Sequence, residues 1–219
     1  MKALLLDYDG TLAVVDEERF AEEYFFNFNV FLVEKYKTAL DHFEILDCLA
    51  QITKCSDGRV NNYERFVKCL TDKFEKFDWK EVFDSFYNSE EFEALNGLVK
   101  PNEKTLELLR KAKQLGLLVV LATNPIFPRS ATEKRLRWIS LSLSDFDYAT
   151  FMENSHFCKP DPRYFLEICE AISVDPKDCL MIGDDDLLDG SCTSVGMKYK
   201  SIELFSRDGK KDLRELFSE

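Results

Sequence analysis

Residues 2–12 read KALLLDYDGTL, and this stretch decides the fold. A short apolar run, Ala3 to Leu6, stops at the carboxylate of Asp7, and a second carboxylate, Asp9, follows just before Gly10. A short apolar run bounded by a glycine turn is typical of a buried strand in a parallel sheet. Open α/β sheets bind their ligands at the carboxyl ends of the strands. We therefore predict that Asp7 lies at the ligand-binding edge of such a sheet.

The two carboxylates can converge, because residues i and i+2 of an extended segment share a face. Neighbouring carboxylates repel each other unless a cation lies between them, and their oxygens suit Mg²⁺. The same residues are also compatible with a strand that ends in an ordinary Asp-Gly turn. A calcium loop fits less well, because Gly10 comes too early and no helix precedes it.

The composition is that of an ordinary globular protein. The chain has 219 residues, of which 45% are hydrophobic and 32% are charged, enough for one core domain and a smaller module. The net charge of -12 argues against nucleic acid or an anionic membrane as a partner. A small phosphorylated substrate remains possible, because one local positive site can hold it.

The cysteines and the apolar segments bear on location. The seven cysteines are an odd number without a C-x-x-C pair, which predicts reduced thiols in a cytoplasmic protein rather than a zinc site or a disulfide framework. The apolar run at the N-terminus is too short for a signal peptide. No stretch approaches the roughly 20 apolar residues of a membrane span.

Residues 15–96 differ in character from the start of the chain. Amphipathic patterns predict four helices, over Glu17–Thr38, Asp41–Thr53, Asn62–Phe77 and Asp78–Phe92. This segment holds 12 of the 19 phenylalanines. They indicate the core of a helical bundle more strongly than an aromatic-lined substrate pocket, although both remain open.

After the linker at residues 96–101, strands and helices alternate. The expected strands are Leu117–Ala122, Tyr148–Phe151, Cys179–Ile182 and Met197–Ile202. The expected helices are Pro101–Leu115, Pro128–Ile139, Pro162–Ile172, Leu187–Ser194 and Lys210–Phe217. This alternation predicts an α/β fold, a three-layer doubly wound parallel sheet with right-handed crossovers.

Two further segments carry polar groups suited to phosphate. Thr123 ends an apolar strand, and its hydroxyl with the backbone N–H of Asn124 could bind a phosphate oxygen, although Asn-Pro is also a common turn. Lys159 precedes Pro160, which holds the lysine in an extended loop. There it could balance the carboxylates and contact phosphate, although on composition alone a solvated surface lysine is the simpler interpretation.

The last segment, residues 180–189, reads LMIGDDDLLD. An apolar strand again ends in carboxylates, from Asp184 onward. Acidic residues near a helix N-terminus are favoured by the helix dipole. Three consecutive aspartates exceed what a helix start requires, and metal binding would explain the excess.

These four segments resemble the four motifs of the haloacid dehalogenase-like hydrolase superfamily, in the same order. They are DYDGTL at residues 7–12, Thr123 at a strand end, KPDP at residues 159–162, and Gly183-Asp184 with Asp189 in a G-D-x-x-x-x-D spacing. The resemblance covers residues 1–14 and about 97–205. It implies a catalytic core at residues 1–14 and 97–219, with an α-helical cap inserted at residues 15–96.

The resemblance also implies a Mg²⁺-dependent phosphohydrolase that acts on a small phosphorylated metabolite. Asp7 would be the nucleophile and form an aspartyl-phosphate. Asp9 would act as general acid and then as general base. Asp7, the backbone carbonyl of Asp9 and Asp184 would hold the metal.

Other residues would support the transfer. Thr123, Asn124 and Lys159 would neutralise charge on the phosphoryl group. Asp189 would orient Lys159 or a metal-bound water. Asp185 would contact the residues that bind the metal rather than the metal itself.

Three rival functions remain at this stage. A phosphomutase uses the same four motifs, and a non-catalytic module could use the helical segment as a partner-binding surface. A dehalogenase is disfavoured, because that branch needs no acid at the position of Asp9. The sequence leaves the substrate and the oligomeric state open.

Overall fold

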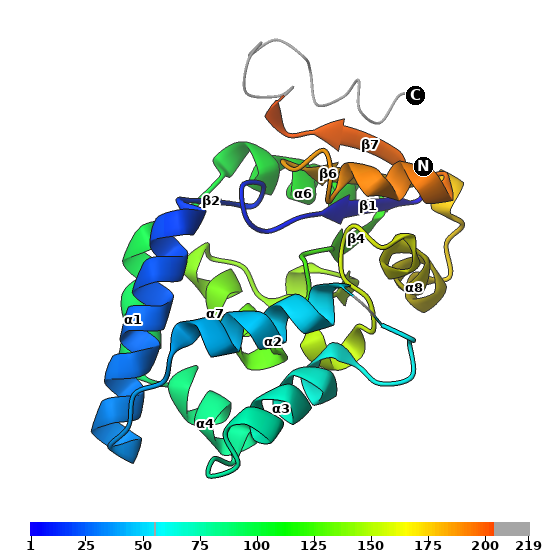
Figure 1. Ribbon diagram of the computed structural model, residues 1–219. Coiled ribbons are helices and arrows are strands. Elements are labelled where there is room, and N and C mark those ends of the chain that lie inside the picture. The colour runs from blue at the N-terminus through cyan, green and yellow to red at the C-terminus, as the bar shows by residue number, and fades with distance from the viewer. Residues whose placement is uncertain (55, 204–219) are drawn as a thin grey trace.

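The computed structural model describes residues 1–54 and 56–203. Its centre is a five-stranded sheet in the order β5-β4-β1-β6-β7, in which every pairing is parallel (Figure 1). The strands are β1 (Ala3–Leu6), β4 (Leu118–Leu121), β5 (Tyr148–Ala149), β6 (Cys179–Gly183) and β7 (Lys198–Ser201).

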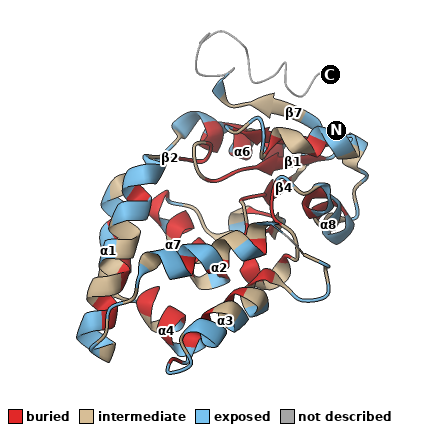
Figure 2. Ribbon diagram, in the orientation of Figure 1, coloured by how far each residue is buried: buried red, intermediate tan, exposed pale blue. Residues whose placement is uncertain are grey.

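Side chains alternate between the two faces of the central strand. Leu4 and Leu6 pack in one buried cluster with α6 (Glu103–Gln114) and α7 (Arg129–Trp138). Ala3 and Leu5 belong to a second cluster that includes side chains of α8 (Pro162–Ile172) and of the 3₁₀ segment η5 (Gly190–Val195). Since neighbouring residues of a strand point to opposite faces, the sheet is covered on both sides. Figure 2 shows its central strands as buried. The predicted three-layer α/β fold is confirmed.

The register of β1 aligns three strand ends. Leu6 lies opposite Leu121 of β4 and Ile182 of β6. The residues that follow these strands, including Asp7, therefore emerge at the same edge of the sheet.

Helices follow one another between residues 17 and 93 in the described part of the chain, and most of them lie in the lower half of Figure 1. They are α1 (Glu17–Tyr36), α2 (His42–Lys54), α3 (Asn62–Lys73), α4 (Trp79–Phe86) and α5 (Glu90–Glu93). The helix expected over Asp78–Phe92 is divided, because the Ser89 side chain caps a new helix by accepting a hydrogen bond from the Phe92 N–H.

The phenylalanines of this segment mainly form a core, as the sequence favoured. Phe28, Phe86 and Phe92 are at most 1% exposed, and the rings of Phe28 and Phe86 lie 4.8 Å apart between centroids. Aromatic contacts of this kind add to the free energy gained from burial.

A second, two-stranded antiparallel sheet was not predicted. It pairs β2 (Ala13–Val15) with β3 (Val99–Pro101), so the chain enters and leaves the helical segment at neighbouring positions. Strands of three residues are too short to show a reliable alternation in sequence.

The remaining differences are local. The expected helix Leu187–Ser194 is the 3₁₀ segment η5, because the Asp185 carboxylate accepts the Leu187 and Leu188 N–H groups and holds a turn before it. The expected strand Tyr148–Phe151 ends at Ala149. Further short 3₁₀ segments are η1 (Ala94–Leu98), η2 (Leu143–Asp145), η3 (Met152–Asn154) and η4 (Pro176–Asp178). The expected helix Lys210–Phe217 lies outside the described residues.

The prediction of reduced thiols throughout is wrong for two cysteines. Cys48 of α2 and Cys69 of α3 form a disulfide, whereas Cys158, Cys169, Cys179 and Cys192 are free and buried. The two bonded cysteines are 21 residues apart and meet only because α2 packs on α3. No local spacing in the sequence reports such a contact.

In the part of the chain that the structure describes, no helix has the length and apolar character needed to cross a bilayer.

Candidate active site

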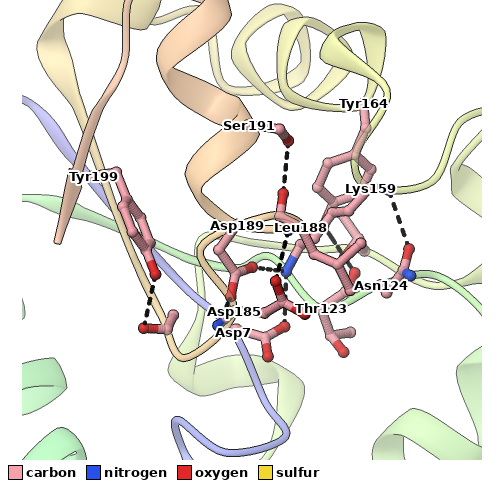
Figure 3. A network of polar contacts seen from close by, with 12 residues as sticks. Asp7, Thr123, Asn124, Lys159, Tyr164, Asp185, Leu188, Asp189, Ser191 and Tyr199 are labelled. Carbon is pink, nitrogen blue, oxygen red and sulfur yellow. Dashed lines mark hydrogen bonds and ion pairs between the residues drawn. The ribbon is translucent and has the colours of Figure 1, made fainter. Parts of the chain in front are cut away.

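The carboxyl edge of the sheet holds a buried lysine between two carboxylates (Figure 3). The Nζ of Lys159 lies 2.8 Å from Oδ1 of Asp7 and 2.5 Å from Oδ1 of Asp189. The side chains of Lys159 and Asp189 are both 2% exposed. The predicted first, third and fourth motifs therefore meet through direct ion pairs.

The positive charge of Lys159 and the negative charges of Asp7 and Asp189 stabilise one another. Burial alone would lower the pKa of Lys159, but the negative charge of Asp7, together with that of Asp189, raises it above its ordinary value. Lys159 therefore remains an ammonium group. Burial raises the pKa of the Asp7 carboxyl, and the nearby Lys159 charge opposes that effect. A buried carboxyl beside a cation is a frequent feature of catalytic sites.

The second motif is tied to the third by a hydrogen bond. The Lys159 N–H donates to Oδ1 of Asn124 at 3.2 Å. The Thr123 carbonyl accepts hydrogen bonds from the hydroxyls of Tyr164 at 2.8 Å and Thr150 at 2.7 Å. Ala122, directly before Thr123, donates its N–H to the Leu6 carbonyl, so Thr123 is held beside the end of β1.

Three aspartates form a cluster that fits a metal ion. Asp7, Asp184 and Asp189 each offer one carboxylate oxygen, and these oxygens all lie within 4.8 Å of one another. Hard oxygen donors of this kind suit Mg²⁺. The predicted ligands Asp7 and Asp184 are thus brought together. Asp189, predicted to orient other groups, contributes the third oxygen.

The other two aspartates of the fourth segment have separate contacts. Asp185 accepts backbone hydrogen bonds through its side chain and donates its own N–H to Oδ2 of Asp189 at 3.3 Å. Asp186 accepts a hydrogen bond from the hydroxyl of Tyr199 at 2.9 Å. Asp185 therefore holds the loop that carries Asp189.

The absence of a side chain at Gly10 leaves room for the Asp184 carboxylate. A Cβ on Gly10 would lie 2.0 Å from Oδ2 of Asp184, and the φ of Gly10 is +65°. We expect Gly10→Ala to weaken Mg²⁺ binding by about tenfold, a typical effect of disturbing the groups around a metal ligand. Titration calorimetry with MgCl₂ measures this change.

Gly116→Ala is the matched control for that variant. Gly116 has a similar φ of +73°, but a Cβ there would meet nothing within 4 Å. It should carry only the left-handed backbone cost of about 1–2 kcal/mol in stability and bind Mg²⁺ as the wild type does. Equal Mg²⁺ affinities in the two variants would show that Gly10 does not position Asp184.

Arg135 is a residue of this site that the sequence interpretation missed. Its Nη2 lies 2.5 Å from Oδ1 of Asp9, and its guanidinium lies 4.3 Å from the ring centroid of Tyr8 and 4.6 Å from that of Phe127. Burial would lower the pKa of Arg135, but the charge of Asp9 raises it, so the guanidinium stays charged. The Asp9 carboxylate thus pairs with Arg135.

A signal for Arg135 was present in the sequence. It follows Ala131 by four positions and precedes Ile139 by four, so it falls on the buried face of α7. Its neighbours Lys134 and Arg137 are also basic, so the residue type alone does not mark Arg135 as the buried cation.

A cavity of about 210 Å³ adjoins Asp9 and Arg135. Its walls come from α1, α2, α3, Tyr87 and the residues before α7. Some aromatic side chains of the helical segment thus line a pocket, the possibility that the sequence placed second.

A sequence model of haloacid dehalogenase-like hydrolases matches residues 1–189 of the chain. No curated protein matches the chain.

Several solved structures share the fold. One is the HAD family enzyme BT-2542 from Bacteroides thetaiotaomicron, with a TM-score of 0.59 and 19% identity over 99% of this chain and 98% of that one. BT-2542 has also been crystallised with magnesium and inorganic phosphate. A HAD phosphatase from Thermococcus onnurineus has a TM-score of 0.59 and 21% identity over 100% and 97% of the two chains.

A third structure is CbbY from Rhodobacter sphaeroides in complex with phosphate, with a TM-score of 0.60 and 20% identity over 92% of this chain and 85% of that one. At these identities the likeness shows the fold alone.

Proposed function

Because the chain belongs to the haloacid dehalogenase-like hydrolase family, we propose that it is a Mg²⁺-dependent phosphatase of small phosphorylated metabolites. The observation that carries the proposal is the buried Asp7 carboxylate, paired with Lys159 and grouped with Asp184 and Asp189 at the end of β1. The same group supports assigning each motif residue a role in phosphoryl transfer.

The proposed reaction has two steps. An Asp7 oxygen attacks phosphorus, the bond from phosphorus to the leaving oxygen breaks, and Asp9 gives that oxygen a proton. Water then attacks the aspartyl-phosphate, Asp9 takes a proton from the water, and phosphate and free Asp7 result. The ion pair with Arg135 fixes where the Asp9 carboxylate lies between these steps.

Positive charge and hydrogen-bond donors support both steps. Lys159, the Thr123 hydroxyl and the Asn124 N–H would contact the transferring oxygens, and Asp189 holds Lys159 in place. Asp7, the Asp9 carbonyl and Asp184 would hold Mg²⁺. When bound, the ion supplies positive charge that offsets the charge on those oxygens.

The division into domains is part of the proposal. Residues 15–96 would be a cap that closes over the site and excludes water, and residues 1–14 and 97–219 would be the catalytic core. The pairing of β2 with β3 supports this division, because both links between the two parts lie together. A cytoplasmic location is proposed as well, although the Cys48–Cys69 disulfide is unusual for a reducing compartment.

A phosphomutase remains the alternative, since it would use the same motif residues and return the phosphoryl group to the substrate. Free phosphate appears in proportion to substrate consumed only for a phosphatase, so product analysis separates the two.

The proposal is tested with p-nitrophenyl phosphate as a general substrate. Hydrolysis is expected in MgCl₂ and should fall by about an order of magnitude or more in EDTA, because the site loses a charge worth several kcal/mol to the transition state. Excess MgCl₂ added after EDTA should restore the rate. Equal rates with and without the metal would contradict the proposed metal dependence.

A further inference from the structure

The cavity beside Asp9 bears on the substrate, provided that the proposed function is correct. Asp9 lines the cavity of about 210 Å³ and is two residues from the nucleophile Asp7. In the proposed reaction Asp9 gives a proton to the leaving oxygen, so the atoms attached to that oxygen must lie next to Asp9. The cavity therefore holds the body of the leaving group. The helices α1, α2 and α3, which supply most of its lining residues, are labelled in Figure 1.

The cavity walls are mainly aromatic and aliphatic. The aromatic side chains are Phe20, Tyr24, Phe25, Phe66, Tyr87 and Phe127. The two tyrosine hydroxyls are hydrogen-bonded to each other at 3.0 Å, and burial raises the pKa of Tyr24 to about 12, so it stays neutral. A polyol would exchange its hydrogen bonds to water for contacts with this surface, at a cost in free energy.

The charges in the cavity oppose a second anionic group. Among the described residues that line it, Arg135 is the one cation, whereas Asp9 and Glu17 are acidic. Arg135 already pairs with Asp9 at 2.5 Å. A second phosphate on the leaving group would lie near the Glu17 carboxylate and would compete with Asp9 for Arg135, the one cation among these lining residues.

The volume of the cavity limits the size of the leaving group that fits inside it. An apolar protein cavity of about 150 Å³ is large enough to bind benzene. A cavity of about 210 Å³ therefore accepts one ring with short substituents.

From these observations we propose that the substrate is a phosphate monoester of an uncharged, apolar alcohol or phenol, whose body is about the size of one substituted ring. Sugar phosphates and bisphosphates are poor substrates on the same grounds. A mutase that must hold two phosphates is disfavoured as well.

The test compares three monoesters in which phosphate is attached through a CH₂ group to a six-membered ring. Benzyl phosphate and cyclohexylmethyl phosphate have apolar rings, whereas glucose 6-phosphate has a polar one. We expect kcat/KM in MgCl₂ to be about 10- to 100-fold higher for the two apolar esters, in line with the burial of one ring. Acetyl phosphate, which has almost no body, is assayed beside them to report the hydrolase chemistry itself.

Two neighbouring phenylalanines of α1 provide a matched pair of variants. Phe25 lines the cavity, whereas Phe26 is 65% exposed and does not line it. Phe25→Gln should lower the ratio of kcat/KM for benzyl phosphate over glucose 6-phosphate by about fivefold or more, and Phe26→Gln should leave that ratio unchanged. If Phe25→Gln does not fold, Leu46→Gln replaces it, because Leu46 lines the cavity and is already 39% exposed.

The outcomes distinguish the proposal of an apolar leaving group from the proposal of a hydrolase. Turnover of acetyl phosphate together with an equal or higher kcat/KM for glucose 6-phosphate would overturn the apolar leaving group and leave the hydrolase intact. The apolar leaving group would also be overturned by turnover of acetyl phosphate alone. Equal effects of Phe25→Gln and Phe26→Gln on the kcat/KM ratio would overturn it as well. No Mg²⁺-dependent turnover of any of the four compounds would reject the hydrolase proposal and, with it, this inference.

Discussion

Replacing Asp7 with asparagine is expected to lower kcat for p-nitrophenyl phosphate by about 10⁴-fold or more, the scale seen when a catalytic nucleophile is removed. The amide cannot form the aspartyl-phosphate, so the first step has no nucleophile. The protein should remain folded, because asparagine has nearly the shape of aspartate and Lys159 keeps its ion pair with Asp189 at 2.5 Å. Steady-state kinetics and circular dichroism measure the two properties.

Asp178→Asn is a matched control for that variant. Asp178 also pairs with a lysine, Lys2, at 2.9 Å, but it precedes β6 and so lies at the opposite edge of the sheet from Asp7. Its replacement should leave kcat within about twofold of the wild-type value, since changes at exposed ion pairs have small effects. Wild-type turnover by Asp7→Asn would remove the nucleophile assignment.

The parts of this site that the sequence predicted share one property: their signal is local. An apolar run that ends in Asp7, Thr123 or Asp184 marks both a buried strand and the polar group at its end. Parallel pairing then brings such ends together, whatever the rest of the chain does. The α/β fold and the grouping of Asp7 with Asp184 could therefore be inferred from short stretches, whereas Lys159 was placed beside them only by the resemblance of its segment to the third motif.

The parts that were missed depend on contacts between distant elements. Arg135 gains its role only when α7 packs beside Tyr8 and Asp9, which precede it by more than 120 positions. The Cys48–Cys69 disulfide similarly requires α2 to pack on α3. Periodicity reports which face of a helix is buried but not what that face meets, so neither contact could be read from the sequence.

Replacing Lys159 with methionine should lower the free energy of unfolding in EDTA by about 3–5 kcal/mol, as expected when one partner of a buried ion pair is removed. The reason is that Asp7 and Asp189 would be left buried and close together without the ammonium that lies between them. Activity should fall as well, by about 10²-fold or more, because a positive contact to the transferring group is lost. Urea unfolding and steady-state kinetics measure the two effects.

Lys177→Met separates the role of burial from that of charge. Lys177 also pairs with an aspartate, Asp175, at 2.9 Å, but its side chain is 73% exposed, so loss of this pair should change the stability very little. The effect of MgCl₂ on stability further distinguishes Lys159→Met from the wild type. A divalent cation held by Asp7 and Asp184 would partly replace the missing charge, so Lys159→Met should gain more stability from MgCl₂ than the wild type does. Lys159→Met could instead lose no more stability than Lys177→Met and gain nothing extra from MgCl₂. In that case Lys159 would not be the charge that holds Asp7 and Asp189 together. Its proposed role in the reaction would then lose its structural support.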